Sequence, residues 1–282
     1  MKITVAKRAG FCFGVKRAVN IAFDMASKKE GVCTLGPIIH NPQLVKSLED
    51  QGVHCVNEPH EDMKAVIIRT HGIPIQMYDK IVDMGIEVID ATCPFVKKAQ
   101  QYAKLLKQEN YQVIILGESV HPEVKSIMSY VGQDVIVVEN EHVPERLKTR
   151  VGVVVQTTQP VSALKRLLNN IVERVKEIKI YNTICNSTAL RLKETSDISN
   201  NVDVMIVAGG RNSANTTQLA NHCQGIGVST FHIETASELD PSWFNGVNHV
   251  GVTAGASTPD WIIEEIIERI NNIGGLTGNG IT

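Results

Sequence analysis

Several features that identify common classes of protein are absent from this sequence. Of its 282 residues only 5% are aromatic, and no apolar run approaches the roughly 20 residues that a membrane span needs. Charge of neither sign dominates, because 28 Lys and Arg balance 30 Asp and Glu, which argues against nucleic-acid binding through phosphate contacts. The N-terminus lacks the apolar core of a signal peptide. We therefore expect a soluble, cytoplasmic protein with neither a membrane nor a nucleic acid as partner.

Familiar cofactor-binding signatures are missing as well. No Walker motif occurs, and the segment AGGRNSAN at 208–215 lacks the spacing of the dinucleotide fingerprint. The six cysteines include no C-x-x-C pair, and cytoplasmic chains rarely build a disulfide framework. Chemistry based on cysteine must then depend on residues distant in the sequence that meet in the fold.

What the sequence does contain is a regular alternation of strands and helices. Short apolar runs with little polar alternation, as expected of strands buried on both faces, lie at 65–70, 113–117, 152–156, 204–209 and 250–255. Amphipathic stretches such as 96–108 and 260–271 follow them. This alternation predicts an α/β fold with mainly parallel sheets.

Three sets of segments repeat along the chain. In the first set each segment is expected to be a strand that ends in a cysteine, at Cys12, Cys93 and Cys185, and a helical stretch follows each. In the second set His40, His121 and Ser213 each lie 28 residues after the cysteine of their repeat. In the third set His71 and Thr157 lie three residues before a proline, and Ser257 lies two residues before one. Such agreement in three places indicates true repetition.

The repeats predict three α/β units, at 1–92, 93–184 and 185–282, the last with a C-terminal tail. The third repeat ends in a helix where the other two continue into a strand that leads to a cysteine, and the strand at 2–6 can supply the missing piece. We therefore expect the three units to close into a ring, or trefoil, around a central site.

All of the repeated positions fall where a strand gives way to a helix. Ligands bind at this edge of parallel sheets, and the following prolines mark helix N-termini, which attract anions. Three thiolates at the centre suit either zinc or an iron–sulfur cluster with one iron lacking a protein ligand, and ligation by thiolates alone favours the cluster. Cys33, Cys55 and Cys223 have no repeat partners, and we interpret them as structural.

The other repeated positions favour anion binding and proton transfer. We interpret His40, His71 and His121 as an anion-binding cluster whose members add positive charge if protonated. Small hydrogen-bonding groups at helix starts extend this set: Thr157, Ser213, Asn215 and Ser257. Glu123, two residues after His121, is the carboxylate nearest to a repeated position, and we assign it as a general acid.

In combination these motifs resemble one known family. The segments GFCFGVKRAV, HNP, RTHGIP, DATCP, GESVHPEV, QTTQP, GGRNSANT and VTAGASTPDW are similar to those of the LytB/IspH family of 4-hydroxy-3-methylbut-2-enyl diphosphate reductases, over residues 3–271. The resemblance implies reductive removal of an allylic hydroxyl, giving isopentenyl and dimethylallyl diphosphate, as the last step of the methylerythritol phosphate route to isoprenoids. It also implies a [4Fe-4S] cluster and an electron donor such as ferredoxin or flavodoxin.

The resemblance also implies roles for individual residues. It places the cluster ligands at Cys12, Cys93 and Cys185, the acid at Glu123, and Thr157 near the substrate hydroxyl. The diphosphate-binding positions implied by the resemblance are His40, His71, His121, Ser213, Ala214, Asn215 and Ser257. Ala214 stands where the family often has serine, so a contact there must come from its backbone N–H.

Two alternatives remain open at this point. A redox-neutral iron–sulfur dehydratase also uses an open iron, but it needs no external electrons. A sensor of metal or anions on the same scaffold would bind without turnover.

Overall fold

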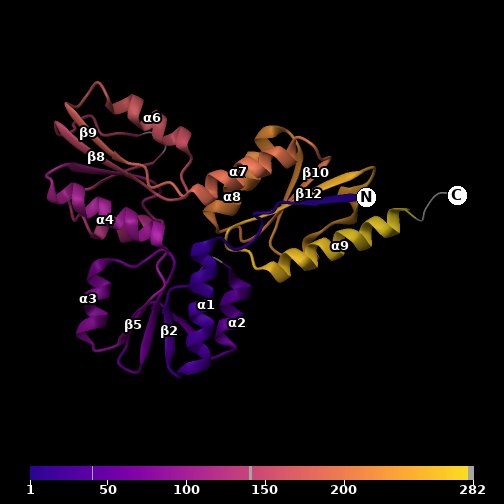
Figure 1. The fold of residues 1–282 in the computed structure, drawn as a ribbon, viewed down its shortest axis with the longest axis horizontal. Coiled ribbons are helices and arrows are strands. Elements are labelled where there is room, and N and C mark those ends of the chain that lie inside the picture. The colour runs from indigo at the N-terminus through magenta and orange to yellow at the C-terminus, as the bar shows by residue number, and fades with distance from the viewer. Residues whose placement is uncertain (40, 140–141, 279–282) are drawn as a thin grey trace. The chain divides into compact units, whose positions relative to one another are not determined.

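Three four-stranded parallel sheets organise the computed structural model, which describes residues 1–39, 41–139 and 142–278 (Figure 1). Sheet 1 has the order β3 (His54–Val56), β2 (Val32–Leu35), β4 (Ala65–Ile68) and β5 (Glu87–Asp90). Sheet 2 has the order β7 (Ile136–Val138), β6 (Gln112–Leu116), β8 (Arg150–Val155) and β9 (Glu177–Tyr181). Sheet 3 has the order β11 (Ser229–Ile233), β10 (Val204–Ala208), β12 (His249–Ala254) and β1 (Lys2–Val5). The predicted fold of three repeated α/β units with parallel sheets is confirmed.

The helices follow the strands as the alternating pattern predicts. They are α1 (Phe13–Lys28), α2 (Pro42–Glu49), α3 (Ile75–Asp83), α4 (Pro94–Gln108), α5 (Pro122–Ser129), α6 (Val161–Ile171), α7 (Asn186–Ser199), α8 (Ala214–Ile226) and α9 (Asp260–Gly278), with short 3₁₀ turns at Ala236–Glu238 and Pro241–Phe244. Each proline of the repeated motifs is the first residue of a helix or directly precedes one, as its fixed φ angle favours. Helix α9 continues to Gly278, so part of the expected tail is helical.

The three sheets share one arrangement. Each has two buried inner strands, an outer strand on one side, and on the other side an outer strand that leads toward one of the repeated cysteines. In sheet 3 this last place is taken by β1, which pairs in parallel with β12 and aligns Val5 with Val252. The N-terminal strand therefore completes the sheet built by the last third of the chain.

The chain divides into two compact units, which we describe separately. The first unit comprises residues 1–16, 39–46 and 186–282 and contains sheet 3. The second unit comprises residues 17–38 and 47–185 and contains sheets 1 and 2. The division into three units at 1–92, 93–184 and 185–282 stays a prediction, because it follows the sequence repeats, whereas the two compact units follow contacts in the fold.

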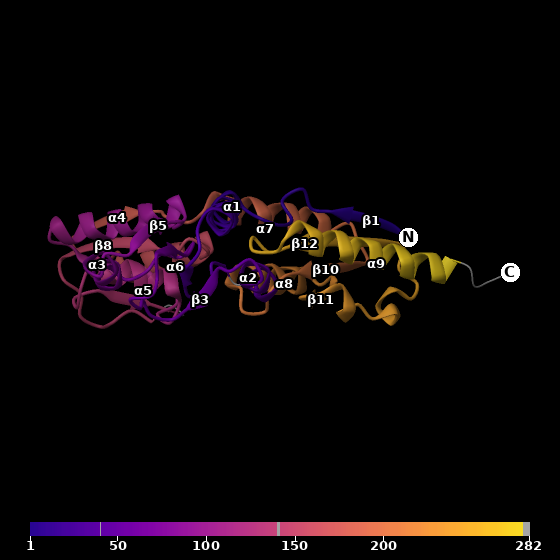
Figure 2. The ribbon, with the colours of Figure 1, turned by 90° about the horizontal axis from the view of Figure 1, so that it is seen from below.

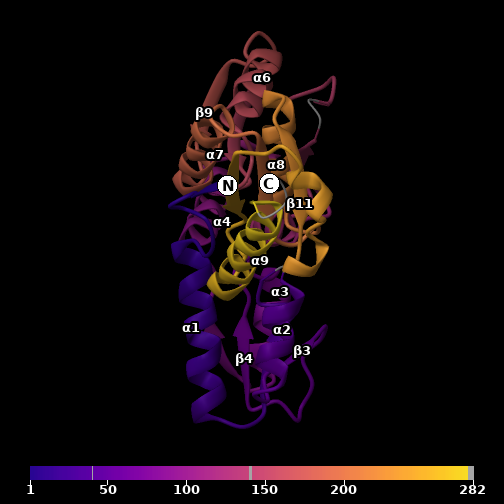
Figure 3. The same ribbon diagram turned by 90° about the vertical axis from the view of Figure 1, so that its right-hand side faces the viewer.

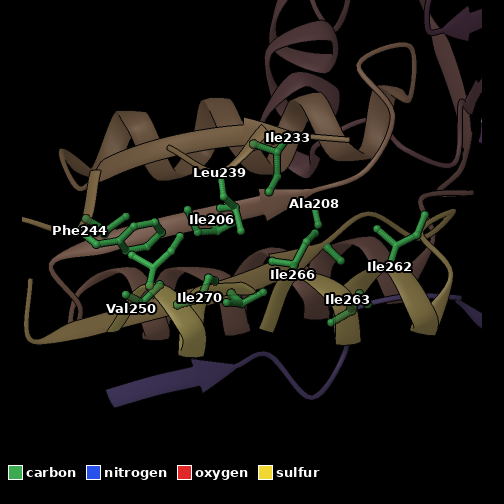
Figure 4. Close-up of a cluster of buried hydrophobic side chains, with 14 residues drawn as sticks. Ile206, Ala208, Ile233, Leu239, Phe244, Val250, Ile262, Ile263, Ile266 and Ile270 are labelled. Atoms are coloured by element: carbon green, nitrogen blue, oxygen red, sulfur yellow. The ribbon is translucent and has the colours of Figure 1, made fainter. Parts of the chain in front are cut away.

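In the first unit, helices cover both faces of sheet 3. Isoleucines of α9 pack on one face, and Figure 4 shows Ile266 and Ile270 directed toward Ile206 of β10 and the ring of Phe244. Leu219 of α8 packs on the other face with residues of α7. Ile3 and Val5 of β1 pack against the same buried cluster as the isoleucines of α9, so the first strand and the last helix lie side by side (Figure 2 and Figure 3). No helix among the described residues has the length and apolar character needed to cross a bilayer.

In the second unit, α4 lies close against sheet 2. Leu106 of α4 reaches the backbone of Gly152 on β8, where a Cβ atom would lie only 2.6 Å from its Cδ2 atom. A side chain at this glycine would push α4 away from the sheet. Since Cys93 is the residue directly before α4, this close packing also fixes one of the repeated cysteines.

Candidate active site

The three repeated cysteines lie just before helix N-termini. Cys93 is the N-cap residue of α4, while Cys12 and Cys185 directly precede α1 and α7. The expectation that each strand ends in its cysteine is wrong, because β1, β5 and β9 end several residues earlier. Loops carry the chain from strand to helix, so each cysteine lies directly before the N-terminus of a helix.

One backbone hydrogen bond holds each cysteine in the same way. The N–H of Cys93 donates to the Thr70 carbonyl (2.9 Å), and that of Cys185 to the Thr157 carbonyl (2.9 Å). The N–H of Cys12 donates to the Ala256 carbonyl at 3.3 Å. These bonds align Thr157 with Thr70 and Ala256, so Thr157 is offset by one residue from His71 and Ser257, with which the sequence grouped it.

The donor set fits a thiolate-bound metal group. All six cysteines are thiols, and the three repeated ones are partly exposed. Cys33 and Cys223 are buried, and burial raises the pKa of both thiols, which disfavours thiolate formation. Of the three repeated cysteines, Cys12 belongs to the first unit, and Cys93 and Cys185 belong to the second. Within neither unit do the described residues gather three or more His, Cys, Asp or Glu side chains into a metal-binding group.

In the second unit, a buried carboxyl group and a threonine form a tight pair. Glu123, in the first turn of α5, is 1% exposed. One of its carboxylate oxygens accepts a hydrogen bond from the Thr157 N–H (2.7 Å) and the other from the Thr157 hydroxyl (2.8 Å). Burial raises the pKa of Glu123 to about 7, and the two bonds, which favour the carboxylate, offset this only in part. Such a carboxyl group can hold and release a proton near neutral pH.

The raised pKa of Glu123 predicts a pH dependence of stability. Its ordinary pKa is 4.5 and the folded value is about 7, so the folded chain binds this proton more tightly than the unfolded chain. The resulting stabilisation is complete below about pH 4.5 and is lost as the pH rises through about 7. Relative to Glu123→Gln, which cannot ionise, we expect the wild type to lose up to about 3 kcal/mol over this window.

Urea unfolding of both proteins at a series of pH values measures this difference. Glu118→Gln is a matched control, because Glu118 is an exposed carboxylate close to Glu123 in the sequence. A difference between wild type and Glu123→Gln that stays constant with pH would contradict the raised pKa.

His121 is the N-cap residue of α5, and its ring accepts a hydrogen bond. The Glu123 N–H donates to Nδ1 of His121 at 3.1 Å. A ring nitrogen that accepts carries no proton, so His121 is neutral while this bond is kept and presents Nε2–H as its donor. The ring of His71 meets it edge-on, with centroids 5.3 Å apart and planes at 88°. His121 therefore offers a donor but not the positive charge considered from the sequence; His40 lies outside the described residues.

In the first unit, three buried polar residues lie at the carboxyl edge of sheet 3. Ser213 is the N-cap residue of α8, and Asn215 and Ser257 are each less than a tenth exposed. The Ala256 N–H donates to Oδ1 of Asn215 at 2.9 Å, which fixes the orientation of the amide. Its Nδ2 is buried and has no hydrogen-bond partner among the described residues, so this N–H group can serve a ligand. Ala214 begins α8 and offers only its backbone.

Reasoning from sequence missed the side chains that hold these loops. In the first unit, Arg191 of α7 is 2% exposed and donates hydrogen bonds to the carbonyls of Ala254 and Gly10. These bonds tie the loop that carries Cys12 to the end of β12. In the second unit, Gln100 of α4 donates to the Ser126 hydroxyl (2.7 Å), which donates to the Ile73 carbonyl (2.8 Å). These two hydrogen bonds join α4, α5 and the loop that carries His71. No local sequence signal marks these residues, because their partners are distant in the chain.

Fold and site together define a class of protein. It is an α/β enzyme with thiols ahead of helix N-termini, a buried carboxyl group whose pKa is raised to about 7, and donors suited to an anion. The chain belongs to the LytB family, whose model, described as LytB protein, matches residues 3–271. Iron–sulfur chemistry is typical of that family, in agreement with the thiol set.

Similar proteins support the same family. The 4-hydroxy-3-methylbut-2-enyl diphosphate reductase of Syntrophotalea carbinolica is 49% identical over 277 residues, which cover 97% of this chain and 99% of that protein. The reductase of the same name from Geobacter sulfurreducens is 50% identical over 273 residues, covering 96% and 97%.

Two solved structures have similar folds. One is (E)-4-hydroxy-3-methyl-but-2-enyl diphosphate reductase, described as the terminal enzyme of the non-mevalonate pathway, with a TM-score of 0.73 and 44% identity over 96% of this chain and 99% of that one. The other is the E-1-hydroxy-2-methyl-but-2-enyl-4-diphosphate reductase of Plasmodium falciparum, with a TM-score of 0.87 and 26% identity over 95% and 87%.

Proposed function

We propose that this chain is a 4-hydroxy-3-methylbut-2-enyl diphosphate reductase. It takes two electrons and two protons, breaks the allylic C–O bond of its substrate, and releases water with isopentenyl or dimethylallyl diphosphate. This is the last step of the methylerythritol phosphate pathway. Beyond family membership, the observation that carries the proposal is the buried Glu123–Thr157 pair, because loss of a hydroxyl group as water requires a proton donor protected from solvent.

The thiols of Cys12, Cys93 and Cys185 are proposed to hold a [4Fe-4S] cluster. Their support is the shared backbone hydrogen bond, the position before a helix, and partial exposure. Such a cluster, with one iron free of protein ligands, supplies electrons and a Lewis acid to the substrate oxygen. A fourth thiolate is not part of the proposal, because the remaining cysteines have no repeat partners and two of them are buried.

Glu123 is proposed to donate the proton to the departing hydroxyl. Near neutral pH a carboxyl group with a pKa of about 7 is partly protonated, which suits a general acid. The Thr157 hydroxyl donates a hydrogen bond to the carboxylate at 2.8 Å, which orients the acid. Its oxygen can at the same time accept a hydrogen bond from the substrate hydroxyl. The N–H of the same residue holds the second oxygen, so the carboxyl group has a single orientation.

The diphosphate is proposed to bind the polar groups at the sheet edges. His71 and His121 offer ring donors in the second unit, and Ser213, Asn215 and Ser257 offer hydroxyl and amide donors in the first. Ala214 adds a backbone N–H, and His40 completes the proposed set. The unpartnered Nδ2 of Asn215 supports this assignment, since buried donors normally have an acceptor.

The electrons for the reaction are proposed to come from a protein such as a ferredoxin or flavodoxin. The reaction is proposed to take place in the cytoplasm, where thiols remain reduced.

Anaerobic incubation with the substrate, with and without a low-potential reductant, tests the function. We expect both five-carbon diphosphates only when reductant is present. Loss of water without reductant would instead identify a redox-neutral dehydratase. Tight diphosphate binding by cluster-loaded protein without any turnover would identify a sensor.

A further inference from the structure

Arg69 is a cation at the carboxyl edge of sheet 1 that the proposed roles do not use. It directly follows β4 and precedes Thr70 and His71, within the motif RTHGIP. The residue is half-buried, and its Nε atom is buried with no hydrogen-bond partner among the described residues. No carboxylate of the described residues forms a salt bridge with it.

The neighbouring strand leaves a space for this guanidinium. Gly36 follows β2, which pairs with β4 and aligns Leu35 with Ile68. A Cβ atom on Gly36 would lie 2.5 Å from Nη1 and 3.2 Å from Cζ of Arg69, and its φ of +68° also favours glycine. The guanidinium therefore lies across the end of the neighbouring strand, at the edge where parallel sheets bind ligands.

Holding a cation in this position is costly without a negative partner. Burial lowers the pKa of Arg69, yet a guanidinium keeps its proton in a protein, so the charge remains. The neighbouring Cys55 opposes this lowering of the Arg69 pKa only in part. The buried Nε–H group has no hydrogen-bond partner among the described residues, so an anionic ligand can both accept this hydrogen bond and pair with the charge.

The proposed diphosphate site needs such a charge. A diphosphate carries more than one negative charge at neutral pH, and His121 is neutral while its Nδ1 accepts the Glu123 N–H. The proposed hydroxyl and amide donors are neutral as well. Arg69 is two residues from His71, whose ring contacts that of His121, and it belongs to the same unit.

We propose that Arg69 supplies the positive charge that binds the diphosphate group of the substrate. The inference rests on the proposed function for the identity of that group. It also assigns a role to Gly36, which leaves room for the guanidinium.

Binding of inorganic diphosphate to the anaerobic, cluster-loaded protein tests this role without turnover. Arg69→Met should weaken binding at least about tenfold, because it leaves the anion without its charged partner. Arg69→Lys keeps the charge and the alkyl stem, so it disturbs the fold least and should weaken binding by less than about threefold. Affinity should fall with added salt in the wild type and the lysine variant, and less steeply in the methionine variant.

Arg150→Met is the matched control. Arg150 begins β8, at the opposite end of its sheet from the carboxyl edge, and pairs with Glu177 on the surface. Its removal should leave diphosphate affinity unchanged. The inference is overturned if folded Arg69→Met binds like the wild type, or if folded Arg69→Lys loses about tenfold.

Wild-type turnover separates this inference from the proposed function. If the wild type reduces the substrate while Arg69→Met keeps full diphosphate affinity, only the role of Arg69 fails. If the wild type binds diphosphate through Arg69 but forms no product with reductant, the proposed function fails and the anion site stands.

Discussion

Glu123→Gln is expected to lower kcat by at least about a hundredfold while leaving the affinity for inorganic diphosphate within about threefold of wild type. Glutamine has nearly the same shape, and its single oxygen can still accept one of the two hydrogen bonds that Thr157 donates, but it has no acidic proton for the leaving hydroxyl. The wild-type rate should also fall as the pH rises through about 7, as Glu123 ionises. The residual rate of the variant should lack this decline.

Glu118→Gln provides the matched comparison for this experiment. Glu118 is exposed, and its backbone N–H donates to the side chain of Gln156 while its carbonyl accepts from the His121 N–H, bonds that the substitution leaves in place. This variant should keep the wild-type rate and pH profile. If Glu123→Gln turns over near the wild-type rate, Glu123 is not the proton donor.

Replacement of Cys12, Cys93 or Cys185 by serine is expected to remove most of the iron from the anaerobically prepared protein. A serine hydroxyl is a far weaker ligand for iron than a thiolate, and these three positions are equivalent in the repeats, each directly before a helix. Iron and acid-labile sulfide per chain measure the loss. Turnover should fall in parallel with cluster content.

The other three cysteines supply the controls. Cys33→Ser, Cys55→Ser and Cys223→Ser should keep wild-type iron, because these residues have no counterparts in the repeats, and burial keeps Cys33 and Cys223 protonated. Thermal melting of each variant tells whether a core position has been damaged. Equal iron content in all six variants would contradict the assignment of ligands.

Repetition explains why the fold could be predicted so far from one sequence. Most inner strands are short, largely apolar runs, so β4, β6, β8, β10 and β12 can be recognised without any tertiary information. The missing strand of the third repeat pointed to the N-terminus, and β1 does pair with β12.

Other parts of the fold depend on contacts that the sequence does not display. The outer strands β3 and β7 have three residues each, too few for a pattern, and they exist because an inner strand pairs with them. The cysteine loops begin earlier than expected because the strands end where their pairing partners end. The one-residue offset of Thr157 within the third set likewise emerges from backbone hydrogen bonds rather than from proline spacing.

The candidate site also contains residues that the sequence indicated and residues whose roles only the structure shows. Residue types at repeated positions indicated Glu123 and the three cysteines, but the proton state of His121 depends on a backbone N–H of the next helix. The supporting side chains of Arg191 and Gln100 are held by partners far away in the chain. Arg69 stood within a recognised motif, yet its role required its burial and the space over Gly36 to be known.

The number of electrons consumed per molecule of product tests the central claim most directly. A measured amount of low-potential reductant is titrated anaerobically into cluster-loaded protein with excess substrate, and the five-carbon diphosphates are quantified in the same sample. Reductive loss of the hydroxyl group predicts two electrons for each product molecule, both for the wild type and, at a far lower rate, for Glu123→Gln. Product formed without consumption of electrons would contradict a reductase.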